Sequence, residues 1–151
     1  MNGSICKTDE YGNKRWYLNG QFHRENGPAY ECFTTGDNFW YLNGKLHRED
    51  GPAIEGKSGT KKWYINGTLH REDGPAVEYI DGTKKWIVRG QFHNVNGPAI
   101  IYSTGVVKWY INGKNITNEI IQWAEENSID LNNITEVDKA LIKLIWGDYG
   151  Q

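Results

Sequence analysis

Cysteine is scarce in this sequence, and the two that occur, Cys6 and Cys32, are too few to form a disulfide scaffold. They also lack the CxxC spacing of zinc and redox sites. No stretch reaches the roughly 18 consecutive apolar residues that a membrane-spanning helix requires, and the first residues contain no apolar segment of signal-peptide length. These absences predict a cytoplasmic protein that is neither secreted nor inserted in a membrane.

An excess of positive charge is missing as well. The 151 residues carry a formal net charge of −2, whereas binding to nucleic acid or to an anionic lipid surface normally depends on a basic face. We therefore expect neither nucleic acid nor membrane as a partner.

Catalytic motifs are also missing. The sequence contains no nucleophile elbow, P-loop, HExxH or paired-carboxylate motif. Its polar residues recur together in several copies, which is typical of residues that maintain a repeat. We predict that the protein is not an enzyme and that it needs no cofactor.

The dominant feature of the sequence is a repeated segment that begins with tryptophan in each copy. Steps of 24, 23, 23 and 23 residues separate Trp16, Trp40, Trp63, Trp86 and Trp109. In the clearest copy, Trp-Tyr-Ile-Asn-Gly (63–67) is followed by His-Arg-Glu-Asp (70–73) and Gly-Pro-Ala (74–76). A fixed period of this length indicates a repeat architecture.

Each copy predicts a β-hairpin. The tryptophan segment alternates, with Trp on one side and Tyr17, Tyr41, Tyr64, Ile87 or Tyr110 on the other. Asn-Gly then favours a turn, because both residues tolerate positive φ. In the return strand, Val77 and Tyr79 are expected to join Trp63 on the inner face. The tyrosines and the lysines that precede Trp would share the outer face.

These residues resemble the MORN repeat in its longer variant form, over about residues 9–114. The resemblance implies a mainly β fold, an elongated single-layered antiparallel sheet of β-hairpins. It also implies a scaffold, a dimerisation surface or a protein-docking surface. Variant arrays with a short helical tail look like proteins of bacteria, tailed phages and giant viruses. The implied function is a phage or bacterial accessory protein that binds and blocks a host protein in the host cytoplasm.

The period changes after the fifth tryptophan segment. We divide the chain into a repeat array, 1–116, with four full repeats and half units at its ends, and a two-helix C-terminal cap, 117–151. Thr117 or Asn118 is expected to cap a helix that ends near Asn127, and residues 135–138 resemble a capping box. An amphipathic stripe is expected to bury itself on the open end of the array: Val137, Ala140, Leu141, Leu144 and Ile145.

The tyrosine side is the candidate partner-binding surface. A single-layered sheet buries only one face well, and we assign most of Trp40, Trp63 and Trp86 to the thin core on that face. The tyrosines on the other face are the candidates for binding, because aromatic side chains are enriched in binding hot spots. The predicted surface comprises Tyr17, Tyr41, Tyr64, Tyr110, Lys62 and Lys85. The partner is expected to be a protein, and a homo-oligomer is a further expectation.

The His-Arg loop is the alternative site, and it comprises His23, Arg24, His47, Arg48, His70 and Arg71. Acidic residues follow each arginine, which favours neutralisation within the loop over phosphate binding. Equivalent histidines would lie ~10 Å apart, too far to share a metal whose ligands lie ~3–4 Å from each other. We therefore predict no metal and interpret each histidine as hydrogen-bonded within its own loop. If this edge is instead the site, the chain is a small-ligand or nucleotide-sequestering protein; a lipid-binding module or a hydrolase is less favoured.

Overall fold

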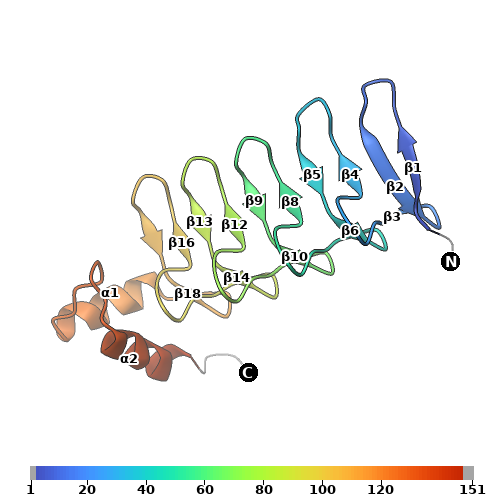
Figure 1. Ribbon diagram of the computed structural model, residues 1–151. Helices are drawn as coiled ribbons and strands as arrows, with labels where there is room; N and C mark the ends of the chain where they lie inside the picture. The colour runs from blue at the N-terminus through green and yellow to red at the C-terminus, as the bar shows by residue number, and fades with distance from the viewer. Residues whose placement is uncertain (1–2, 148–151) are drawn as a thin grey trace.

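The computed structural model describes residues 3–147 and shows an elongated antiparallel sheet in hairpin order, followed by two C-terminal helices (Figure 1). The expected mainly β, hairpin-repeat fold is thereby confirmed. Within the described residues the main path of the sheet follows the order β1 (Ile5–Thr8), β2 (Lys14–Leu18), β4 (Tyr30–Glu31), β5 (Asn38–Phe39), β8 (Ile54–Glu55), β9 (Lys61–Lys62), β12 (Val77–Glu78), β13 (Lys84–Lys85), β16 (Ile100–Ile101), β17 (Val107–Lys108).

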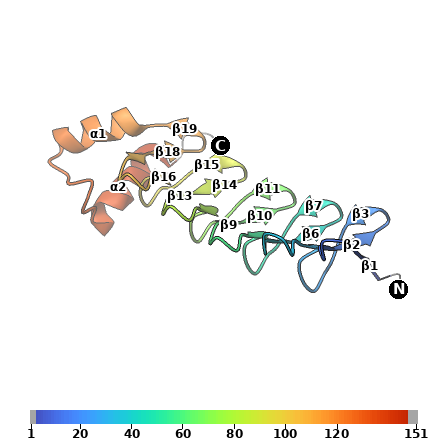
Figure 2. The same ribbon diagram turned by 90° about the horizontal axis from the view of Figure 1, so that it is seen from above.

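A row of short hairpins runs beside the main sheet (Figure 2). β3 (Gln21–Phe22) pairs with the end of β2. The other hairpins are β6 (Tyr41–Leu42) with β7 (Lys45–Leu46), β10 (Tyr64–Ile65) with β11 (Thr68–Leu69), β14 (Ile87–Val88) with β15 (Gln91–Phe92), and β18 (Tyr110–Ile111) with β19 (Lys114–Asn115). Backbone bonds link neighbouring hairpins, as in Gly67 N–H to Leu46 O (2.8 Å).

Tryptophan is the residue at which the chain changes sheet partner. The N–H of Trp63 donates to Ala76 O of the main sheet (2.9 Å), and Trp63 O accepts from the N–H of His70 (3.1 Å) at the base of the short hairpin. The equivalent bonds occur at Trp16, Trp40 and Trp86. A continuous strand through the tryptophan segment was expected, but from the second repeat on the strand is interrupted at Trp, because its two backbone groups bond to different partners.

The apolar core of the repeats lies between the main sheet and the row of short hairpins. Val77 of β12 clusters with Ala76 and Ile87, and Leu69, Tyr79 and Phe92 pack against them. Ile87 occupies the tyrosine position of its repeat and is only 5% exposed. The tyrosine side is therefore the inner side, and the expectation that it faces outward is wrong.

The two helices cover the last repeat. α1 (Thr117–Glu126) ends as expected, but the expected side-chain cap is absent, because Thr117 Oγ1 instead accepts from the N–H of Trp109 (3.0 Å). α2 (Glu136–Trp146) begins with the expected capping box, in which Thr135 Oγ1 accepts from the N–H of Asp138 (3.2 Å). Among residues 3–147, no helix has the length and hydropathy that crossing a membrane requires.

The expected buried stripe of α2 is wrong, because the helix turns its opposite face to the array. Ile142 and Trp146 are buried against Trp109, whereas Val137 and Leu144 are 69% and 76% exposed and Ala140, Leu141 and Ile145 are also exposed. α2 carries apolar residues on both faces, so the spacing of apolar residues cannot by itself show which face is buried. Leu131 and Ile134, in the connection between the helices, pack against the same cluster and fix the side from which α2 approaches.

Candidate interaction site

A row of clefts follows the tryptophans, on the side of the short hairpins opposite the core. We call them the tryptophan clefts and number them along the chain; their floors are Trp16 and Leu18 (cleft 1), Trp40 and Leu42 (cleft 2), Trp63 and Ile65 (cleft 3), Trp86 and Val88 (cleft 4). Their volumes are ≈ 540, ≈ 660, ≈ 550 and ≈ 220 Å³ respectively. Clefts of a few hundred Å³ are large enough to receive side chains or a small ligand.

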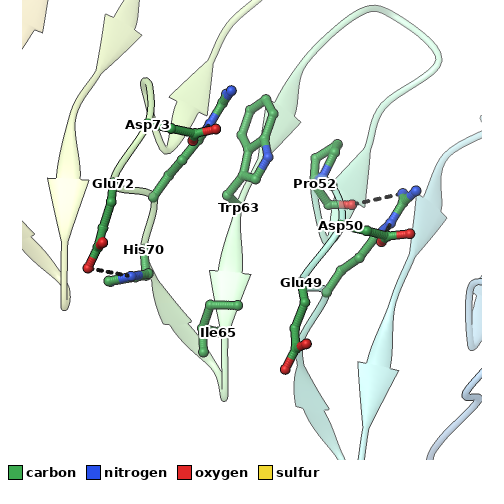
Figure 3. Close-up of a pocket in the computed structure, with 11 residues that line it drawn as sticks. Glu49, Asp50, Pro52, Trp63, Ile65, His70, Glu72 and Asp73 are labelled. Carbon is green, nitrogen blue, oxygen red and sulfur yellow. Dashed lines mark hydrogen bonds and ion pairs between the residues drawn. The ribbon is translucent and has the colours of Figure 1, made fainter.

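Cleft 3 shows how the loops of two successive repeats build a site (Figure 3). Trp63 and Ile65 lie on the floor, since they stand two residues apart in an extended segment and share one side. The loop 48–52 of the preceding repeat forms one wall and the loop 70–73 forms the other. In cleft 1, Gly3 and Ser4 stand in place of the preceding loop. The alternative loop-edge residues are thus brought together with tryptophan side chains that the sequence had assigned to the core.

In clefts 1–3, the arginine of the loop stacks on the tryptophan of the floor. The Arg71 guanidinium carbon lies 4.1 Å from the centre of the Trp63 ring, and Arg24 and Arg48 lie 3.8 and 4.1 Å from Trp16 and Trp40. A Cβ on Gly74 would lie 2.8 Å from this Arg71 carbon, so glycine leaves the room that the arginine needs. The arginine stands eight residues after its tryptophan in these three copies, a sequence signal that could have revealed the clefts.

Each arginine is already paired with carboxylates. Arg48 donates to Asp50 (2.8 Å), Glu55 (2.8 Å) and Pro52 O (3.3 Å), and Arg71 repeats these bonds with Asp73, Glu78 and Pro75 O. These hydrogen bonds from arginine lower the pKa of Asp50 and Asp73. The expected neutralisation within the loop is confirmed for Arg48 and Arg71, which also bond to a glutamate of the return strand. Arg24 has Asn26 where the other loops have Asp, and it pairs with Glu31 of the return strand (2.9 Å).

The histidines tie consecutive repeats together. The N–H groups of Asn43, Asn66, Arg89 and Asn112 donate to Nδ1 of His23, His47, His70 and His93, at 3.1–3.2 Å. The acceptor histidine lies one repeat earlier, so the expectation of a bond within the same loop is wrong. The donor residues stand at φ 47–51°, the strained first position of the hairpin turn. The histidine therefore fixes the turn of the next repeat.

Replacement of His47 by alanine is expected to lower the free energy of unfolding by about 1 kcal/mol, because Asn66 N–H loses its acceptor in a partly hydrated place. Glu49→Ala is the matched control, since the contact of Glu49 with this ring is made to its far nitrogen, Nε2, at 3.7 Å. Urea unfolding of both variants measures the difference. A larger loss in the Glu49 variant would show that the ion pair, and not the turn contact, is the stabilising interaction.

The predicted tyrosine surface is largely packed. The Phe22 ring stacks between Tyr17 and Tyr41, with ring centres 4.9 and 5.1 Å away, and Phe92 lies 5.2 Å from Tyr110. Burial raises the pKa of Tyr41 and Tyr64. Lys62 and Lys85 flank the Tyr79 ring, with Nζ 5.7 and 5.1 Å from its centre. The tyrosines thus contribute mainly to the core, and their exposed edges are the part left for a partner.

The rims of the clefts are acidic. The loops 23–27, 47–51 and 70–74 contain three arginines and five carboxylates, and the side chains of Glu25, Glu49 and Glu72 are 79%, 84% and 73% exposed. Each faces the Nε2 of its histidine at 3.7–3.9 Å. In the described part of the chain, no three His, Cys, Asp or Glu side chains converge on a point that could hold a metal ion.

At the fifth tryptophan, Trp109, the position that corresponds to a cleft is filled by side chains of α1 and α2. Ile116 N–H donates to Trp109 O (2.9 Å), as the histidine N–H does in the other copies, so Ile116 takes the place of histidine and α1 begins where arginine would stand. Trp109 and Ile111, the equivalents of Trp63 and Ile65, are each 1% exposed beneath the α1 and α2 side chains. Val95, which stands where Glu72 does, packs against this cluster.

Comparison of the chain with known proteins adds no assignment: no protein-family model matches it, and no curated protein matches it either.

Proposed function

We propose that this chain is a non-enzymatic protein-interaction module of the MORN-repeat type, and that it binds its partner along the row of tryptophan clefts. The resemblance to arrays of bacteria, phages and giant viruses favours a host protein that the module blocks by occupying its surface. The carrying observation is that clefts 1–4 are open, while the equivalent fifth position is filled by apolar side chains of α1 and α2.

The composition of an open cleft supports this proposal. Trp63 and Ile65 are only partly covered, although large apolar side chains gain about 1.5–3 kcal/mol when fully buried. Four clefts in line, one at each of the first four repeat tryptophans, offer a partner several contacts at a regular spacing. Aromatic side chains in pockets are the residues that dominate binding energy in protein interfaces.

The small-ligand or nucleotide-sequestering alternative has one feature in its favour, the size of the clefts. The charge of the clefts disfavours binding of a phosphate group. The three arginines are each bound to at least one carboxylate, and the rims carry further exposed glutamates. One face of each tryptophan ring is also already occupied by arginine in clefts 1–3. We keep this alternative as an outcome of the test.

The test is affinity capture from the native host with immobilised protein, comparing wild type with Leu42→Asp/Ile65→Asp. Aspartate on two cleft floors is expected to reduce retention of the partner at least tenfold. The control, Ile80→Asp/Val106→Asp, introduces the same charge at two exposed apolar positions outside the clefts. Thermal unfolding verifies that both variants are folded.

Two other results would each overturn the assignment of the clefts. If the cleft variant retains the partner while Tyr41→Ser/Tyr64→Ser loses it, the predicted tyrosine surface is the site. If no protein is retained and a nucleotide copurifies with the wild type, the sequestering alternative replaces ours.

A further inference from the structure

We propose that the partner segment is a basic amphipathic helix whose apolar side chains, seven residues apart, enter consecutive tryptophan clefts. This inference rests on the proposed function and specifies the chemistry of the occupant. It draws on the filled fifth position, on the charge of the open clefts and on the repeat spacing.

The filled fifth position shows what kind of group these floors accept. Trp109 and Ile111 are covered by Ile120 of α1 and by Ile142 and Trp146 of α2. These side chains project from helices, and the pairs that meet the floor are one turn apart, as in Ile142 and Trp146. A helix that presents apolar side chains is therefore a shape to which this floor is complementary.

The loops that wall the open clefts differ in charge from the loop beside the fifth position, so an occupant of the open clefts needs a charge that α1 and α2 do not need there. At the fifth position the preceding loop has Asn94, Val95 and Asn96 where cleft 3 has Arg48, Glu49 and Asp50, and Val95 packs on the chain's own helices. Clefts 2 and 3 keep exposed glutamates at the corresponding places. An apolar helix alone would leave those carboxylates beside buried surface, whereas lysine or arginine next to its apolar positions would pair with them.

The geometry of the array sets the spacing. Each repeat adds two strands to the main sheet, which advances the array by ~9.6 Å. An α-helix rises ~10.5 Å over seven residues, so apolar residues at i and i+7 reach neighbouring clefts. A shorter spacing of three or four residues, ~4.5–6 Å, would place both side chains in the same cleft.

A display library of helical 20-residue peptides with randomised surface positions, panned against the full chain, tests the proposal directly. We expect enrichment of peptides with large apolar residues seven apart and with lysine or arginine at adjacent positions. The selected peptide should bind Glu49→Lys/Glu72→Lys at least tenfold more weakly than wild type, and its affinity should fall with salt. The control, Glu10→Lys/Glu125→Lys, makes the same change in net charge at exposed positions away from the clefts and should bind as wild type does.

The proposal is overturned if no peptide is enriched, if the enriched peptides are acidic or extended, or if charge reversal at Glu49 and Glu72 leaves binding unchanged. This result is distinguishable from failure of the proposed function. A partner that is captured through Leu42 and Ile65, while basic helices do not bind, leaves the interaction site in place and refutes only the chemistry of the occupant. Capture that survives aspartate on both floors refutes the site itself.

Discussion

Replacement of Ile142 by alanine is expected to lower the free energy of unfolding by about 2–5 kcal/mol, the usual cost of truncating a fully buried isoleucine. Ile142 is 0% exposed and clusters with Trp109 and Trp146, so its truncation leaves a cavity among apolar side chains. The loss is measured by urea unfolding. Because the last repeat is then less well covered, we also expect the variant to aggregate at lower temperature than wild type.

Leu144→Ala is the matched control for this prediction. Leu144 lies two residues further along α2 and belongs to the stripe that spacing alone marks as buried, but it is exposed. Its truncation is expected to change stability by about 0.5 kcal/mol or less. A greater loss for Leu144 than for Ile142 would show that α2 packs with the opposite face on the array.

Replacement of Ala76 by leucine is expected to destabilise the protein by about 1–3 kcal/mol, because a filled site cannot accept a larger side chain without displacing its neighbours. The alanines of the Gly-Pro-Ala segments, Ala29, Ala53, Ala76 and Ala99, are each 0% exposed. The backbone at Ala76 cannot move aside freely, since its carbonyl binds the N–H of Trp63 (2.9 Å) and its neighbour Val77 pairs with strands on both sides.

The control is Ala140→Leu on the exposed face of α2, where the larger side chain meets solvent and leucine is nearly as good a helix former as alanine. Thermal unfolding of the two variants should separate them by several degrees. Equal melting temperatures would mean that the repeats adjust to a larger residue at this position and that alanine there is not a packing requirement.

Repetition made the array predictable from the sequence. Hairpins, turns and the two helices followed from local signals, such as Asn66-Gly67 at a left-handed turn and the Thr135–Asp138 capping box, which depend on residues near each other in the chain. The pairing of Arg48 and Arg71 with carboxylates was also predictable, because the acidic residues recur at fixed short distances from each arginine.

The tertiary structure decided which faces are covered. Strand alternation placed Trp63 and Tyr64 on opposite sides, but it cannot tell which side becomes the core. That choice follows from the change of backbone partner at each tryptophan, from Ala76 to His70, which brings Ile87, Leu69 and Phe92 against Val77 and leaves the tryptophans at the clefts. The same limit applies to α2, which is apolar on both faces. Only the end of the array and the connection through Leu131 and Ile134 determine that Ile142 and Trp146 are buried, because burial depends on which surfaces meet in space and not on the pattern within one segment.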